Sequence, residues 1–223
     1  MGIFDSIKSV LGTRAEADAS SAADPEALFG MSTAYVTMEA ELGYESAGAA
    51  ALCFSEVDST AFADAVDEVE AILRAGETET GTEFRRRKDD HGYHWVILED
   101  DDPEDLVTSV HFAADEFVEQ GFGSRLLAAA FGFEKIDGEA AEVGGSSGDR
   151  GASASRASTD RAYWIYSFRR GAYYPFCPSG DHDRNTKAEF KLRSVLDGEL
   201  EIEGDESHWY PLWPDVTGGH PWE

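Results

Sequence analysis

The chain has 223 residues, and its 45 acidic side chains outnumber 18 lysines and arginines, so its formal net charge is −27 at pH 7. This charge argues against a nucleic-acid partner, because phosphate backbones are bound by clustered lysine and arginine. It predicts a protein of a salt-rich, halophilic cytoplasm, since salt screens the repulsion between surface carboxylates. The 42% apolar fraction suffices for a hydrophobic core, and no apolar run reaches the roughly 20 residues that span a bilayer.

The first residues predict an amphipathic helix over 1–12. Five apolar side chains share one helical stripe, namely Ile3, Phe4, Ile7, Val10 and Leu11. A linker rich in Ala, Ser and Asp at 13–24 joins this helix to a single α+β domain at 25–223. Ile3, Phe4 and Ile7 are candidate partner-binding residues, on a membrane surface or on another protein, and docking on the chain's own body is the alternative.

The first part of the domain predicts a hairpin and a helix. Short β-prone runs at 34–39 and 50–54 favour the hairpin. Apolar residues at helical spacing predict a helix over 60–75, ended by Gly76.

A second hairpin and the clearest helix follow. The turn residues between 83–88 and 93–99 favour two antiparallel strands. Asp102 is positioned to cap a helix over 103–120, with Pro103 at its first position.

The next segment predicts three strands and an insertion. Residues 126–135 are expected to form an apolar strand. Residues 137–160 are mostly Gly, Ser, Ala and acidic residues, which is typical of a solvated, low-complexity insertion. Two aromatic runs, 162–168 and 172–178, flank an Arg-Arg-Gly turn and predict a hairpin whose second arm, containing Pro175, lies at a sheet edge.

A last helix is predicted over 186–197, capped by Asn185, and an aromatic tail at 209–214 is expected to fold back on the sheet. The expected fold is therefore α+β. It has a mostly antiparallel sheet of about six or seven strands with helices on one face, in addition to the N-terminal amphipathic helix.

Residues capable of chemistry are present, but their spacing does not favour catalysis. His91 and His94 point to opposite faces of a hairpin, which disfavours zinc. Cys177 with His182 is the least implausible nucleophile and base, without a visible third group. We expect no catalytic, cofactor or metal site, and both Cys53 and Cys177 are expected to be buried.

The Arg-Arg turn and the aromatic runs are further candidates for partner binding. Arg169 and Arg170 could grip a partner's carboxylate, or neutralise nearby acids such as Asp181 and Asp183. Five aromatic residues could line a recognition groove or could belong to the core: Tyr173, Tyr174, Phe176, Trp209 and Trp213.

Six sequence blocks are spread over 25–213: Leu28-Phe-Gly-Met-Ser32, Ala51-Leu-Cys-Phe54, His91-Gly-Tyr-His-Trp95, Asp105-Leu-Val-Thr-Ser-Val-His111, Gly121-Phe-Gly-Ser-Arg-Leu-Leu127 and Arg170-Gly-Ala-Tyr-Tyr-Pro-Phe176. Together they resemble the PspAB family, the phage-shock-protein-A-associated proteins, here of the halophilic archaeal type. The resemblance implies a non-enzymatic accessory of a PspA-type envelope-stress response.

The same resemblance implies a PspA-like coiled-coil protein or an HtpX-type membrane protease as partner. The expected location is cytoplasmic, with peripheral contact to the inner face of the membrane through residues 2–11 as a further expectation. Two alternatives remain open at this point: a chaperone-like domain that binds client helices, and a hydrolase that uses Cys177 or a metal held by His91, His94 or His111.

Overall fold

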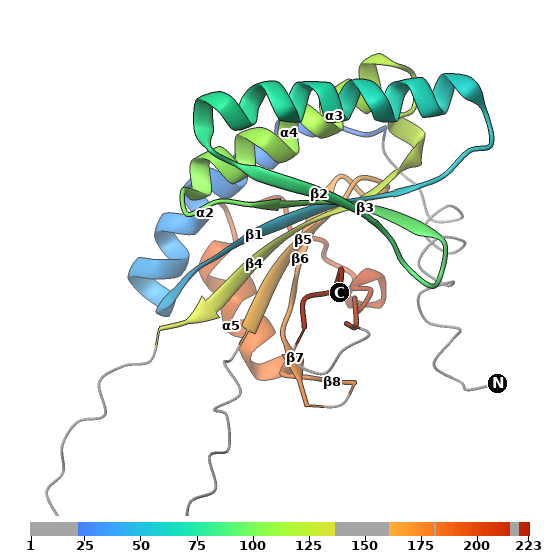
Figure 1. Cartoon of the computed structure of the whole chain (residues 1–223). Helices are drawn as coiled ribbons and strands as arrows, with labels where there is room; N and C mark the ends of the chain where they lie inside the picture. The colour runs from blue at the N-terminus through green and yellow to red at the C-terminus, as the bar shows by residue number, and fades with distance from the viewer. Residues whose placement is uncertain (1–21, 137–160, 181, 215–218) are drawn as a thin grey trace, which may run out of the picture.

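A six-stranded antiparallel sheet in the order β2-β3-β1-β4-β5-β6 organises the molecule (Figure 1). The computed structural model describes residues 22–136, 161–180, 182–214 and 219–223. The strands are β1 (Tyr44–Ser55), β2 (Glu83–Lys88), β3 (Tyr93–Glu99), β4 (Leu126–Lys135), β5 (Arg161–Ser167) and β6 (Ala172–Phe176). Two short strands, β7 (Pro178–Ser179) and β8 (Asp183–Arg184), pair separately. The predicted α+β class is confirmed.

Helices cover one face of this sheet, as predicted. The side chains of each strand alternate, so Leu52 and Phe54 of β1 face the helices while Ala51 and Cys53 face the opposite side. The helical layer contains η1 (Pro25–Phe29), α2 (Gly30–Thr37), η2 (Met38–Leu42), α3 (Thr60–Thr80), α4 (Pro103–Glu119) and α5 (Thr186–Leu196). Among the described residues, no helix is long and apolar enough to cross a bilayer.

The residues after α5, of which 197–214 and 219–223 are described, form what we call the C-terminal segment. Its aromatic residues cover the second face of the sheet, which confirms that the aromatic tail folds back. Trp209, Leu212, Trp213 and Trp222 are buried against inward-facing residues of β3 to β6. Figure 1 shows this segment, in red, on the side of the sheet opposite α3 and α4. Both faces are therefore apolar, which explains why the central strands are nearly continuous hydrophobic runs.

Several local predictions are confirmed. Asp102 accepts a hydrogen bond from the Glu104 amide at 2.9 Å, and Pro103 begins α4. The Asn185 side chain accepts from the Ala188 amide at 3.1 Å and caps α5. β6, which contains Pro175, is the last strand of the sheet.

The predicted first hairpin is wrong, because residues 34–39 are helical. Met31, Ala34, Tyr35 and Met38 are buried at the i, i+3, i+4 and i+7 spacing of a helix, so packing outweighs the β propensity of this run. The helical stretch ends at Gly43, whose φ of 67° suits glycine, and β1 begins at Tyr44.

The end predicted for α3 is also wrong. Gly76 lies inside the helix, which continues through Thr80 to Gly81, where φ is 88°. The Gly81 amide donates to the Glu77 carbonyl at 3.0 Å and closes the last turn. The predicted helix 1–12, most of the linker 13–24 and the insertion 137–160 lie outside the described residues.

A buried ion pair joins the end of β6, α5 and the C-terminal segment. The Arg184 Nε donates to Glu189 Oε1 at 2.9 Å, and its Nη1 donates to the Trp209 carbonyl at 2.8 Å. The same Glu189 oxygen accepts from the Cys177 amide at 2.9 Å. Glu189 is 2% exposed, so its charge depends on these donors.

We expect the change Glu189→Ala to lower the free energy of unfolding by about 3 kcal/mol or more, because it leaves the Arg184 guanidinium without its buried counter-ion. Urea unfolding at constant high salt measures this. Glu206→Ala is the matched control, since the Arg193–Glu206 pair is much more exposed and should contribute less than about 1 kcal/mol. Equal losses in the two variants would contradict this role of Glu189.

Candidate functional site

The five aromatic candidates for a recognition groove are buried. Tyr173, Tyr174, Phe176, Trp209 and Trp213 are between 0% and 8% exposed. Tyr173 lies on the helical face and donates to the Ala27 carbonyl at 3.1 Å. The other four lie on the opposite face, where Tyr174 donates to the Tyr210 carbonyl at 3.1 Å. They therefore do not form one exposed groove, and packing accounts for them.

Arg169 and Arg170 interact with the chain itself. The Arg170 Nε donates to Glu203 Oε2 at 2.6 Å, and the Arg169 Nη2 donates to the Ser124 carbonyl at 2.6 Å. Glu203 is therefore an acid that Arg170 neutralises, and Asp181, one of the acids named in that prediction, lies outside the described residues. Burial raises the pKa of the Glu203 carboxyl, but the hydrogen bonds from Arg170 and from the Asp205 amide outweigh it and hold the pKa below its usual value.

The histidines and Cys177 occupy separate environments. His94 Nε2 lies 3.1 Å from Glu56 Oε2 and its ring stacks on Phe54. Cys177 is buried, whereas His182 is exposed and contacts Trp213. Within the part of the chain that the structure describes, no group of three His, Cys, Asp or Glu residues is arranged to hold a metal. Ile3, Phe4 and Ile7 lie outside the described residues.

An exposed apolar patch on the helical layer was not predicted. Phe29 is 42% exposed and Phe112 is 52% exposed, and both rings contact the buried imidazole of His111, at centroid distances of 4.4 and 5.7 Å. We call Phe29 and Phe112 the Phe29 patch. They come from η1 and α4, so only folding brings them together.

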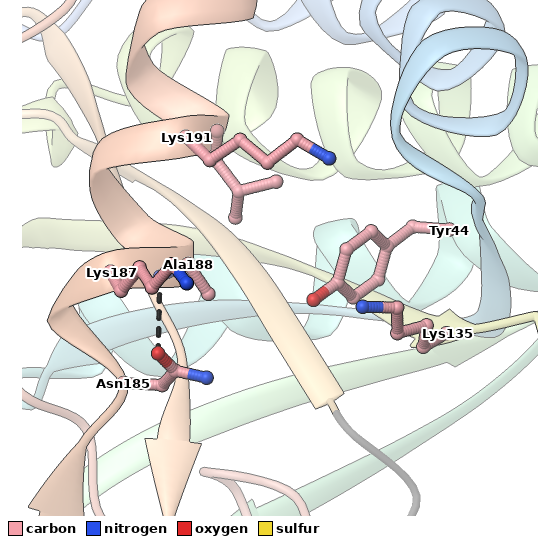
Figure 2. A pocket seen from close by; sticks show the side chains of 7 residues that line it. Tyr44, Lys135, Asn185, Lys187, Ala188 and Lys191 are labelled. Atoms are coloured by element: carbon pink, nitrogen blue, oxygen red, sulfur yellow. Dashed lines mark hydrogen bonds between the residues drawn. The ribbon is translucent and has the colours of Figure 1, made fainter.

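A pocket of about 370 Å³ opens between α5 and the ends of β1 and β4 (Figure 2). Its lining residues are Tyr44, Lys135, Asn185, Lys187, Ala188, Lys191 and Leu192. In Figure 2, Lys135 of β4 lies beside the Tyr44 ring, and Lys191 projects from α5 across the pocket. The Lys135 Nζ lies 5.5 Å from the centroid of the Tyr44 ring. We call this the lysine pocket.

Comparison with protein families gives a match over almost the whole chain, residues 1–222, to PspA associated protein B, or PspAB. The chain belongs to the PspAB family. No curated protein and no solved structure gives a significant match.

Two of the six PspAB-like blocks meet at the Phe29 patch. Phe29 belongs to the block that spans η1 and α2, and His111 belongs to the block within α4. The contact between their rings therefore joins two separate blocks on which the resemblance rests. The Arg170 block instead supplies β6, whose residues are buried, and the half-buried turn before it.

The Arg170–Glu203 pair predicts a pH-dependent contribution to stability. Because the pKa of Glu203 is lowered in the folded state, the pair stabilises the protein above the usual glutamate value of 4.5, and this contribution is lost as the pH falls through the folded pKa. The loss of unfolding free energy caused by Arg170→Gln should thus be largest near pH 7 and shrink below about pH 4.5. Urea unfolding of both proteins across pH 7 to 3 measures it, and a pH-independent difference would contradict it.

Proposed function

We propose that this PspAB protein is a non-enzymatic accessory of a PspA-type envelope-stress response, and that it binds a helix of a PspA-like coiled-coil protein. The observation that carries the proposal is the family match over residues 1–222, since the description of the family names an association with PspA. The proposed role is that of an adaptor in the cytoplasm, working near the membrane.

The Phe29 patch is the surface that best suits such a partner. Amphipathic helices bind through apolar side chains spaced along one face, and aromatic residues commonly contribute most of the binding energy. Phe29 and Phe112 offer two exposed aromatic rings, and both contact the buried imidazole of His111. Contact with a buried side chain restricts the two rings, which lowers the conformational entropy lost when a helix packs on them.

The burial of His111 supports this view. Its Nε2 lies 3.3 Å from Glu26 Oε1, and the imidazole is buried in the side of α4 that faces η1. Glu26 itself is exposed, so the patch has an acidic neighbour at its rim. A partner helix with apolar residues on one face and a basic residue beside them would match both features.

Membrane contact through residues 2–11 and an HtpX-type protease are finer alternatives to the PspA partner. In the proposal, the stripe of Ile3, Phe4 and Ile7 acts as a second attachment point. The chaperone-like alternative relied on a groove lined by the five candidate aromatic residues, and these residues are buried.

We predict that Phe112→Glu weakens binding to a purified PspA-like protein at least about tenfold, which corresponds to ~1.4 kcal/mol, because it places a charge where an apolar contact forms. Isothermal titration calorimetry at one fixed high salt concentration measures the affinity. Phe29→Glu should act in the same way.

Phe190→Glu is the matched control, because Phe190 is 47% exposed and lies on α5, outside the patch. It introduces the same charge and should leave the affinity within about twofold. Wild-type protein that binds an HtpX-type protease but no PspA-like protein would contradict the proposed partner. Equal weakening by the Phe112 and Phe190 variants would contradict the proposed surface.

A further inference from the structure

We propose that the lysine pocket binds a phosphate-bearing organic anion. The phosphate oxygens accept hydrogen bonds from Lys135, Lys187 and Lys191, and the organic part lies against the Tyr44 ring and Leu192. This inference does not rest on the association with PspA.

The distribution of lysine is the first argument. The chain contains five lysines, Lys8, Lys88, Lys135, Lys187 and Lys191, and three of them line this one pocket. None of the seven lining residues is acidic, although 45 of the 223 residues of the chain are Asp or Glu. The pocket is therefore a local concentration of positive charge on a strongly negative protein.

The three lysines also lack ion-pair partners among the described residues. The remaining described lysine, Lys88, lies 2.6 Å from Glu56 Oε2, whereas no described carboxylate forms a salt bridge with Lys135, Lys187 or Lys191. Lys187 and Lys191 are one helical turn apart on α5 and so project from the same side of that helix. Like charges that line one pocket repel one another, and an anion bound in the pocket would relieve the repulsion.

The number of lysines favours phosphate over a single carboxylate. A phosphate group carries a charge of about −1.5 to −2 at pH 7 and presents three acceptor oxygens, so it can accept from three ammonium groups. Lysine is a common phosphate ligand, in which the ammonium acts as a compact point charge.

The shape of the pocket favours an organic phosphate. Its volume of about 370 Å³ falls within the usual range for small-molecule sites. Tyr44 and Leu192 are nearly fully buried, so they form a fixed apolar wall beside the amines. The positive end of α5, next to Asn185, adds to the attraction for an anion at the mouth of the pocket.

Titration of the full chain with inorganic pyrophosphate, at one fixed ionic strength, tests the phosphate site. We expect saturable binding, weakened at least about tenfold by Lys191→Gln and by Lys135→Gln, since each removes a charge-assisted hydrogen bond. Lys88→Gln is the matched control, because it removes one charge from an exposed lysine outside the pocket. It should change the affinity less than about twofold.

Flotation with phosphatidylglycerol vesicles, and with phosphatidylcholine vesicles as reference, distinguishes the source of the phosphate. Binding to phosphatidylglycerol that Lys191→Gln abolishes supports a lipid headgroup, whereas pyrophosphate binding without vesicle binding supports a soluble phosphorylated compound. Three results would overturn the proposal: wild-type protein that binds neither probe, equal weakening by Lys88→Gln, or binding of a polyglutamate peptide in place of pyrophosphate. None of these three results would change the affinity measured for a PspA-like protein. The phosphate proposal and the PspA proposal can therefore be refuted independently.

Discussion

The need to cover both faces of one apolar sheet is the constraint on which this structure depends. Helices bury the face that contains Leu52 and Phe131, and the C-terminal segment buries the face that contains Trp95 and Ile165. The second cover has little regular structure of its own, and a backbone bridge between Tyr173 and Ile202 together with side-chain contacts attaches it. Arg184 donates to the Trp209 carbonyl while paired with Glu189, and the Trp209 indole donates to the Glu203 carbonyl at 3.0 Å. These contacts make the tail part of the core.

This arrangement places the candidate binding surfaces away from the middle of the sheet. The Phe29 patch lies on the outer side of the helical layer, and the lysine pocket lies where α5 approaches the start of β1 and the end of β4. The two surfaces have opposite chemistry, one apolar and one cationic. The two proposals thus assign different ligands to different surfaces of a protein that has a net charge of −27 and three lysines around one pocket. Arginine, in contrast, is used largely to hold the chain together.

Local signals explain which parts of the fold could be predicted from the sequence. The Asp102 cap, the Asn185 cap and the paired aromatic runs of β5 and β6 depend on residues near one another in the chain. Residues 34–39 were predicted incorrectly because their local β preference is overridden by burial of Tyr35 and Met38 against the sheet. The Phe29 patch and the lysine pocket could not be predicted, since each joins residues from distant segments, such as Phe29 with His111.

The most direct test of the central claim is acrylamide quenching of the tryptophan fluorescence of the full chain at high salt. All five tryptophans, Trp95, Trp164, Trp209, Trp213 and Trp222, are at most 8% exposed, and three of them belong to the C-terminal segment. If that segment covers the second face of the sheet, quenching should be uniformly weak and should become strong only on unfolding. A folded protein in which about three fifths of the fluorescence is readily quenched would show that the segment does not cover the sheet.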